Sequence, residues 1–355
     1  MNIFEQMAKY GHEELVFWYD QTTGLKAIVA IHNTTLGPAL GGCRMWPYAS
    51  EEDAITDALR LSRGMTYKNA AMGLDLGGGK SVIWADSRVD KNEALLRAFG
   101  RLIESLQGRY LTAEDVGMTA ADMAVVARET RFVGGLQETS GDPSPATALG
   151  VMEGMKAAAE WVWGSADLKG RHVAIQGMGH VGFLLAQYLH EEGANLTVTD
   201  IHPEDCREAA ERLGARWVEP DAIYAVDADI FAPCALGAVL NDETIPKLKV
   251  RIVAGSANNQ LKEPRHGLEL MKRHIVYVPD YVINGGGVIN VADELGPGGY
   301  HRERAYQRVR LIGRQVAEIL QRSKSEHFTT EEAADHLAEH RLHVLGRVRS
   351  TYVPH

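Results

Sequence analysis

Two lysines twelve residues apart, Lys68 and Lys80, lie in the glycine-rich and largely apolar stretch Gly64–Lys80. Each ammonium in such a pair discourages its neighbour from carrying a proton, so the pair suits chemistry by a neutral amine. Three glycines precede Lys80, and glycine allows a ligand to approach the backbone closely. The stretch therefore predicts a reactive lysine. The alternative is two solvated surface lysines, the usual fate of this residue type.

A dinucleotide fingerprint, Gly177-Met-Gly-His-Val-Gly182, follows about a hundred residues later. It comes directly after a strand-like segment and opens a helical one, as pyrophosphate binding at a helix N-terminus requires. Asp200 lies about twenty residues on, where a carboxylate holds the ribose diol and repels a 2′-phosphate, so NAD is favoured over NADP. The alternative is a glycine turn without a ligand. The residues predicted here to bind NAD are Gly177, Gly179, His180, Val181, Gly182 and Asp200.

A lysine pair and a hydride acceptor together indicate an enzyme that oxidises the carbon bearing a small substrate's amine. Carboxylates for such a site are available at Glu114 and Asp115, directly after a strand-like segment. The run Gly77-Gly-Gly-Lys80-Ser81 also resembles a phosphate-binding P-loop, but Leu74 stands where that motif needs its first glycine. A nucleotide triphosphatase is therefore excluded.

Composition limits the class of protein. The 355 residues are long for one hydrophobic core, so two domains are expected. A formal net charge of -10 disfavours nucleic acid as a partner, and no apolar run is long enough to cross a membrane. Three widely spaced cysteines without a C-x-x-C motif, and an N-terminus without a signal-peptide core, are typical of a cytoplasmic protein.

The elements needed to position these residues can be read from periodicity. Strands are predicted at 15–19 and 25–31 with a turn between them, and helices from about 51 to 63 and from 92 to 107. The turn-rich cluster at 140–145 suggests a domain boundary, with residues 1–142 as a substrate-binding, catalytic and oligomerisation domain. A helix is expected from 146 to 163.

Residues 143–328 are expected to form an NAD-binding domain, because their alternating strand-like and helical segments predict an α/β fold with a doubly wound, parallel Rossmann sheet. Strands are expected at 172–176, 196–199, 229–232, 250–254 and 275–278, and helices at 181–192 and 203–213. One long helix is expected from Tyr300 to Arg322. A capped terminal helix in 329–355 is expected to pack back on the first domain, and a cleft is expected between the domains.

Over its whole length the chain resembles the amino-acid dehydrogenases of the glutamate, leucine, phenylalanine and valine group, most closely the leucine branch. The segments that carry the resemblance are Thr35–Met45, Gly64–Asn69, Leu76–Lys80, Thr112–Gly117, Pro143–Thr147, Phe231–Gly237, Gly255–Gln260 and Pro279–Asn284. The resemblance implies that hydride passes from the substrate's α-carbon to NAD, with release of a 2-oxo acid and ammonium. It also implies a homo-oligomer.

The resemblance implies a role for each matching residue. Lys68, assisted by Asn284, would bind the substrate carboxylate, and Lys80 would be the general base. Asp115 would hold the substrate ammonium together with the Gly41 carbonyl, and would shuttle protons. Thr147 and Asn258 would orient the nicotinamide carboxamide, and Ala235 is a further residue implied to bind the cofactor.

The substrate's side chain would lie in an aliphatic pocket, which is formed by Leu40, Met65, Ala113, Val288 and Val291. Relatives that use glutamate have a lysine in place of Leu40 and a serine in place of Val291, so branched-chain substrates are expected, with leucine first. Gly285 departs from the family's usual alanine and leaves fine preference open, whereas Cys43 for threonine is expected to be neutral.

Three alternatives remain. One is the same chemistry on aromatic amino acids; the second is a catalytically silent NAD-binding regulator; the third is an amine-cyclising deaminase that recycles its cofactor. His336, His340 and His343 share a predicted helix face that could bind zinc, but a solvated histidine face without metal is favoured.

Overall fold

The computed structural model describes residues 2–235, 237–296 and 298–347. The chain divides into two compact units. The first contains residues 1–142, 291–301 and 338–355, and the second contains residues 143–290 and 302–337. The last eight residues of the predicted terminal segment, 348–355, lie outside the described part of the chain.

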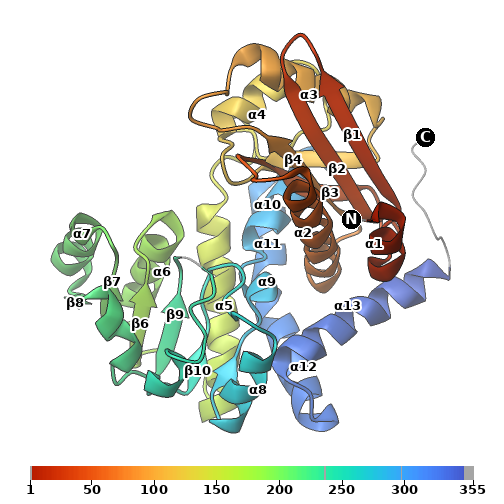
Figure 1. Cartoon of the computed structure of the whole chain (residues 1–355). Helices are drawn as coiled ribbons and strands as arrows, with labels where there is room; N and C mark the ends of the chain where they lie inside the picture. The colour runs from red at the N-terminus through yellow and green to blue at the C-terminus, as the bar shows by residue number, and fades with distance from the viewer. Residues whose placement is uncertain (1, 236, 297, 348–355) are drawn as a thin grey trace. The chain divides into compact units, whose positions relative to one another are not determined.

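The first unit is built on a five-stranded sheet in the order β1-β2-β4-β3-β5. β1 pairs antiparallel with β2, and β2 with β4, whereas β4, β3 and β5 run parallel. The elements of its continuous part are α1 (Ile3–Tyr10), β1 (Glu14–Asp20), β2 (Leu25–Asn33), β3 (Ala39–Trp46), α2 (Glu51–Ala71), β4 (Gly77–Trp84), α3 (Glu93–Ser105), β5 (Tyr110–Glu114) and α4 (Ala120–Val126). The predicted hairpin at 15–31 is confirmed, and it is the long pair β1–β2 in Figure 1.

Helices cover both faces of this sheet. Ile28, Ala30 and Val82 pack against α2 on one face, and the other face forms the larger core with α3. α2 begins as predicted, because the Ser50 side chain accepts a hydrogen bond from the Asp53 amide. It continues to Ala71, eight residues beyond the predicted end at Arg63, and so includes Lys68.

The second unit contains a six-stranded parallel sheet in the order β11-β10-β9-β6-β7-β8, which confirms the predicted α/β class (Figure 1). Its elements are α5 (Ser144–Trp163), β6 (His172–Gln176), α6 (His180–Glu191), β7 (Asn195–Thr199), α7 (Pro203–Leu213), β8 (Arg216–Trp217), η1 (Pro220–Ala225), β9 (Ile230–Pro233), η2 (Ile245–Lys247), β10 (Ile252–Val253), α8 (Arg265–Lys272), β11 (Val276–Tyr277) and α9 (Asp280–Ile283). β10 and β11 are shorter than the sequence predicted.

The remaining helices are α10 (Gly286–Glu294), α11 (Arg302–Arg310), α12 (Ile312–Glu326) and α13 (Thr330–Gly346). The expectation of one helix from Tyr300 to Arg322 is wrong, because the chain turns at Leu311, whose amide donates to the Arg308 carbonyl. Gly313 follows the turn and allows α12 to approach α5 closely: a Cβ there would lie 3.0 Å from the Glu153 carbonyl. The capping box before α13 is confirmed by the reciprocal contacts of Thr329 and Glu332.

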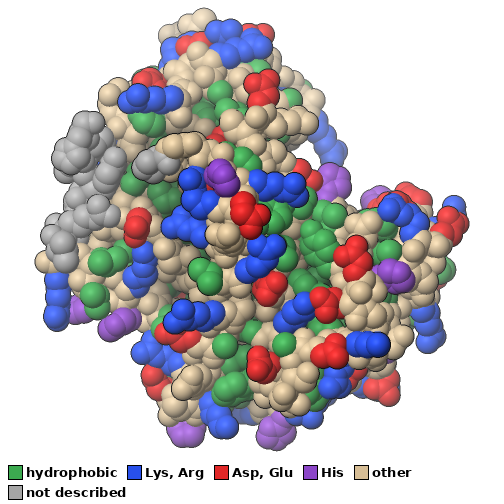
Figure 2. Space-filling view, turned by 180° about the vertical axis from the view of Figure 1, so that it is seen from behind, with side chains coloured by type: hydrophobic (Ala, Val, Ile, Leu, Met, Phe, Trp, Pro, Cys, Tyr) green, Lys and Arg blue, Asp and Glu red, His purple; other side chains and the backbone are tan. Residues whose placement is uncertain are grey.

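Helix length and the distribution of charged side chains both bear on the expectations from the sequence. Within the described ranges, every helix is too short or too polar to cross a lipid bilayer. On the face drawn in Figure 2, lysine and arginine side chains are interspersed with aspartate and glutamate. Nucleic-acid-binding proteins instead gather basic residues on one face.

Candidate active site

Lys80 lies in the central strand of the first unit's sheet, which is an unusual place for a lysine. Alternate residues of a strand point to the same face, and Lys80 shares the face of Val82, which packs against α2. Its side chain is only 5% exposed, and its Nζ lies 3.1 Å from Asp115 Oδ1. Because a lysine is almost never buried without a partner, this position indicates a functional group rather than a solvated lysine.

Two glycines allow Asp115 to reach that lysine. A Cβ on Gly41 would overlap the Gly79 carbonyl, and a Cβ on Gly42 would overlap the Glu114 carbonyl and lie 2.9 Å from the Asp115 Cβ. β3 can therefore lie close to β4 and β5 only with glycine at both positions. The Gly41 carbonyl, predicted to receive the substrate ammonium, accepts a hydrogen bond of 2.5 Å from the Tyr110 hydroxyl.

A third charged group, Arg44, completes this cluster, and the sequence prediction gave it no role. Its Nε lies 2.9 Å from Asp115 Oδ2, and its Nη1 lies 2.9 Å from Asp57 Oδ2. A signal was present, since a lone charge inside the otherwise apolar run Ala39–Trp46 needs a buried partner.

The electrostatics of the cluster make the Lys80 amine easier to deprotonate and keep the Asp115 carboxyl acidic. Burial lowers the pKa of Lys80; Asp115 opposes this effect, and the positive charge of Arg44 adds to it. Burial alone would raise the pKa of Asp115, but Lys80 and Arg44 together hold it below the ordinary value. An amine that loses its proton readily, beside a carboxylate that keeps its charge, can act as a general base.

Lys68 lies in the last turn of α2 and is partly buried. The next residue, Asn69, is fully buried and donates a hydrogen bond of 2.6 Å to the carbonyl of Gly77, the first residue of β4. This contact fixes the end of α2 against the start of the strand that carries Lys80. The two lysines thus belong to two elements tied directly to one another.

The predicted pocket residues fall in both units. Leu40 (1% exposed) and Val291 (9% exposed) are buried, and Met65 and Ala113 are partly buried; all four belong to the first unit. Val288 is partly buried in the second unit and lies one helical turn before Val291 on α10.

In the second unit, the fingerprint has the geometry that a dinucleotide needs. Gly177 adopts φ +97°, a conformation that L side chains rarely adopt, and a Cβ on Gly182 would overlap the Gly177 carbonyl. Gly179 caps α6 without any side-chain hydrogen bond, and a Cβ there would meet nothing within 4 Å. The open approach and the uncapped amides at the start of α6 suit a pyrophosphate.

The carboxylate of Asp200 is held at the end of β7. Its Oδ2 accepts from the Met178 amide at 2.6 Å, and its Oδ1 accepts from the His202 amide at 3.0 Å. Each carboxylate oxygen keeps a further lone pair, so the group can still receive a ribose hydroxyl. The residues present therefore fit NAD.

The residues predicted to contact the nicotinamide are only partly brought together. Asn284 Nδ2 donates to Asn258 Oδ1 at 2.6 Å and to the Ser256 carbonyl at 3.1 Å, which links the two predicted amides. Ala235 lies against the fingerprint turn, since a Cβ on Gly177 would be 2.7 Å from the Ala235 Cβ. Thr147 donates to the Pro143 carbonyl at 3.0 Å.

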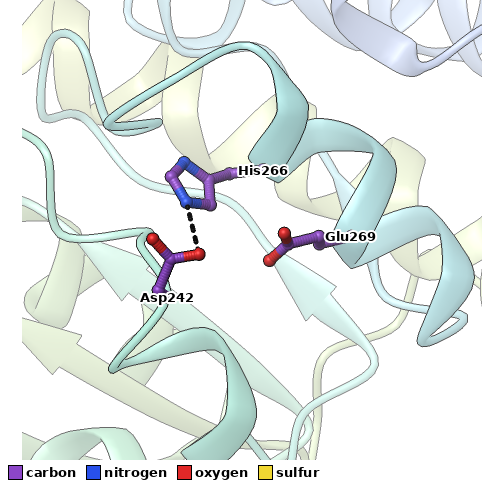
Figure 3. Close-up of side chains that lie close together, drawn as sticks. All are labelled: Asp242, His266 and Glu269. Carbon is purple, nitrogen blue, oxygen red and sulfur yellow. Dashed lines mark ion pairs between the residues drawn. The ribbon is translucent and has the colours of Figure 1, made fainter.

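A second cluster of ionisable side chains lies outside these groups. Asp242, His266 and Glu269 could together offer ligands to a metal ion (Figure 3). Arg265, however, binds both oxygens of Asp242 at 2.6 and 2.7 Å and Glu269 at 3.0 Å. Its guanidinium lowers the pKa of Asp242 to about 2. The His266 Nδ1 accepts from the Glu263 amide, which places the ring's proton on Nε2, facing Asp242. We assign this cluster to an ion-pair network.

Comparison with known proteins places the chain among dehydrogenases. Residues 13–132 match the Glu/Leu/Phe/Val dehydrogenase dimerisation domain, and residues 139–203 and 204–296 match the Glutamate/Leucine/Phenylalanine/Valine dehydrogenase family. The chain is 57% identical to a leucine dehydrogenase of Thermoactinomyces intermedius, over 99% of this chain and 97% of that protein. It is 48% identical to a phenylalanine dehydrogenase of the same organism, over 98% and 96%.

A solved structure, L-tryptophan dehydrogenase from Nostoc punctiforme, is similar with a TM-score of 0.88 and 46% identity, and the match covers 97% of this chain and all of the other. The family matches span most of the sequence, and the relatives align from end to end. These matches establish that this chain belongs to the glutamate/leucine/phenylalanine/valine dehydrogenase family of amino-acid dehydrogenases, and the Lys80–Asp115 pair and the parallel sheet that carries the dinucleotide fingerprint agree with it.

Proposed function

We propose that this enzyme catalyses the reversible NAD-dependent oxidative deamination of branched-chain L-amino acids, with L-leucine as the preferred substrate and valine and isoleucine also accepted. The main observation that supports this reaction is the buried Lys80 amine, whose Nζ lies 3.1 Å from Asp115 Oδ1. The higher identity to a leucine dehydrogenase (57%) than to a phenylalanine dehydrogenase (48%) supports the substrate class.

In this mechanism the first unit supplies the base and most of the groups that bind the substrate. Lys68 pairs with the substrate carboxylate, assisted by the amide of Asn284. Asp115 pairs with the substrate ammonium, next to the Gly41 carbonyl, and exchanges protons with it. Lys80, whose pKa burial lowers, takes a proton in its neutral form from the water that attacks the imine carbon. The resulting carbinolamine collapses to the 2-oxo acid and ammonium.

NAD supplies the hydride acceptor for the α-carbon when it is bound. The start of α6, with Gly177, Gly179, His180, Val181 and Gly182, would hold the pyrophosphate, and Asp200 would hold the ribose diol. A carboxylate at that position repels a 2′-phosphate, which is why we propose NAD rather than NADP. At the nicotinamide end, Thr147 and Asn258 would orient the carboxamide, and Ala235 would be a further residue that contacts the cofactor.

The aliphatic character of Leu40, Met65, Ala113, Val288 and Val291 supports the substrate preference. A leucine side chain buried against such residues gains on the order of 2 kcal/mol. A glutamate carboxylate facing Leu40 and Val291, both buried, would be left unpaired at a cost of roughly several kcal/mol. We further propose that the enzyme works in the cytoplasm as a homo-oligomer, consistent with the match to a dimerisation domain.

The test is a panel of L-leucine, L-valine, L-isoleucine, L-phenylalanine, L-tryptophan and L-glutamate, each assayed with NAD and with NADP. We expect NADH formation with the highest kcat/KM for leucine. A higher kcat/KM for phenylalanine or tryptophan would replace the proposal with an aromatic amino-acid dehydrogenase. NADH binding without turnover of any substrate would instead indicate a regulatory protein.

A further inference from the structure

We propose that Arg44 is a positioning residue of this reaction, which holds Asp115 from the side opposite Lys80 and so keeps the Lys80 amine available as a base. The inference rests on the proposed function, because it assigns the origin of the base's reactivity rather than the reaction itself.

The sheet geometry brings Arg44 to the site. Cys43 and Met45, its neighbours on β3, face the core on the α3 side, so Arg44 points to the α2 side, the face that also carries Lys80. The Asp115 carboxylate is thereby shared: Oδ1 lies 3.1 Å from Lys80 Nζ, and Oδ2 lies 2.9 Å from Arg44 Nε.

This sharing decides which partner keeps its proton. If Lys80 were the only cation near Asp115, the two would form a buried ion pair, and a carboxylate that close would hold the ammonium in its charged form. Arg44 already satisfies that carboxylate, and an arginine does not lose its proton in a protein. The second cation therefore weakens the hold of Asp115 on the lysine's proton and also repels the ammonium directly.

The outer edge of Arg44 is anchored so that the guanidinium cannot turn away. Its Nη1 binds Asp57 Oδ2 on α2, which also accepts from the Tyr48 hydroxyl at 2.8 Å, and Arg60 binds the other oxygen of Asp57 at 2.8 Å. Arg44, Asp57 and Arg60 line a cavity of about 500 Å³, whereas the Lys80 side chain is 5% exposed. Asp57, at the cavity, thus fixes one edge of the Arg44 guanidinium, and the other edge contacts Asp115 of the buried Lys80–Asp115 pair.

Other ionisable groups lie on the elements around Lys80, and a pH effect must be separated from theirs. They are Cys43 of β3, His32 of β2, Asp57 and Lys68 of α2, Tyr110 and Glu114 of β5, and Asp115 itself. Burial raises the pKa of Cys43 to about 12 and lowers that of His32 to about 4, so neither changes charge near neutral pH.

The experiment measures kcat/KM for L-leucine with saturating NAD as a function of pH in Arg44→Met, Arg44→Gln and Arg44→Lys. In the wild type, kcat/KM should rise with pH as Lys80 loses its proton. We expect the midpoint of that rise to move upward by about one pH unit in the two neutral variants, equivalent to a tenfold loss at lower pH that recovers in alkali. Arg44→Lys restores the charge and should bring the midpoint back toward that of the wild type.

Arg128→Met is the matched control, because Arg128 is an exposed arginine of the same unit that pairs with Glu93 rather than with Asp57 or Asp115. Its midpoint should equal that of the wild type. If both neutral variants lose the same factor of kcat/KM at every pH with an unmoved midpoint, Arg44 is merely structural and the inference is wrong. Should Arg44→Met not fold, Arg44→Gln decides the question. If the wild type forms no NADH from any amino acid, it is the proposed function that fails.

Discussion

Replacing Lys80 by alanine tests the site directly, and the structure sets the expected size of the effect. A positioned general base contributes about 10²–10⁴-fold to a reaction rate, so kcat for leucine oxidation should fall by about that factor. The free energy of unfolding should be affected less than the activation free energy. Leaving a buried charge without its partner costs about 3–5 kcal/mol, but Asp115 keeps Arg44 at 2.9 Å. We therefore expect destabilisation below that range, at about 1–2 kcal/mol.

The assay is NADH formation from L-leucine, combined with NADH binding followed by fluorescence. Binding should survive, since the fingerprint belongs to the second unit. Lys80→Arg separates charge from basicity, because arginine can pair with Asp115 but does not give up its proton; it too should be inactive. Lys26→Ala, an exposed lysine on β2, is the matched control with full activity. More than a few per cent of wild-type activity in Lys80→Ala would refute the role of Lys80 as the base.

Three further changes test other parts of the molecule. Asp200→Asn keeps the shape of the side chain and removes its charge, so the ratio of kcat/KM for NADP to that for NAD should rise about tenfold or more; an unchanged ratio would contradict the ribose role. Gly42→Ala should displace Asp115, because the added methyl would overlap the Glu114 carbonyl, and kcat should fall together with the melting temperature; normal kcat would show that β3 and β5 can separate without harm. Burial, followed by the nearby carboxylates of Asp280 and Asp335, raises the pKa of Glu331 to about 7. The folded state therefore binds more protons than the unfolded state between about pH 4.5 and 7, and stability should fall as pH rises through that window. Glu331→Gln should gain about 1–2 kcal/mol at pH 8, after allowance for partial exposure, and nothing at pH 4; equal denaturation midpoints of both proteins at pH 8 would exclude this effect.

Local signals predicted the elements well where one physical cause dominates. The β1–β2 hairpin follows from two apolar runs separated by a polar turn ending in Gly24, which adopts φ +73°. The start of α2 follows from the Ser50 cap. Helix ends that are set by tertiary contacts were harder to predict from the sequence. For example, α2 continues to Ala71 because its last turn packs against β4, where the Asn69 side chain donates a hydrogen bond to the Gly77 carbonyl. The break at Leu311 likewise depends on the approach of α12 to α5, which no local pattern encodes.

The site shows the same division between local and tertiary information. The turn at Gly177 and the carboxylate at Asp200 belong to one local unit with fixed spacing, so the sequence alone could predict their arrangement. Lys80 lies on β4, Arg44 on β3 and Asp115 directly after β5, so their meeting depends on strand order and register. The sequence prediction chose Lys68 as the cation that perturbs Lys80, whereas Arg44 is the cation that the structure places on Asp115. Only the parallel pairing of β3 with β4 and β5 brings that guanidinium to the carboxylate.

The charge balance of this cluster supports the proposal that a lysine is the base here. The carboxylate of Asp115 lies 3.1 Å from the Lys80 amine and is already shared with a permanent cation, Arg44. A neutral amine leaves Asp115 and Arg44 as a balanced pair, whereas an ammonium adds a net positive charge to a buried site. Burial and charge balance thus both favour release of the proton. The same balance requires that a substrate ammonium reaching Asp115 compete with two cations already present, so substrate binding itself should weaken the Lys80–Asp115 contact and free the amine for its role.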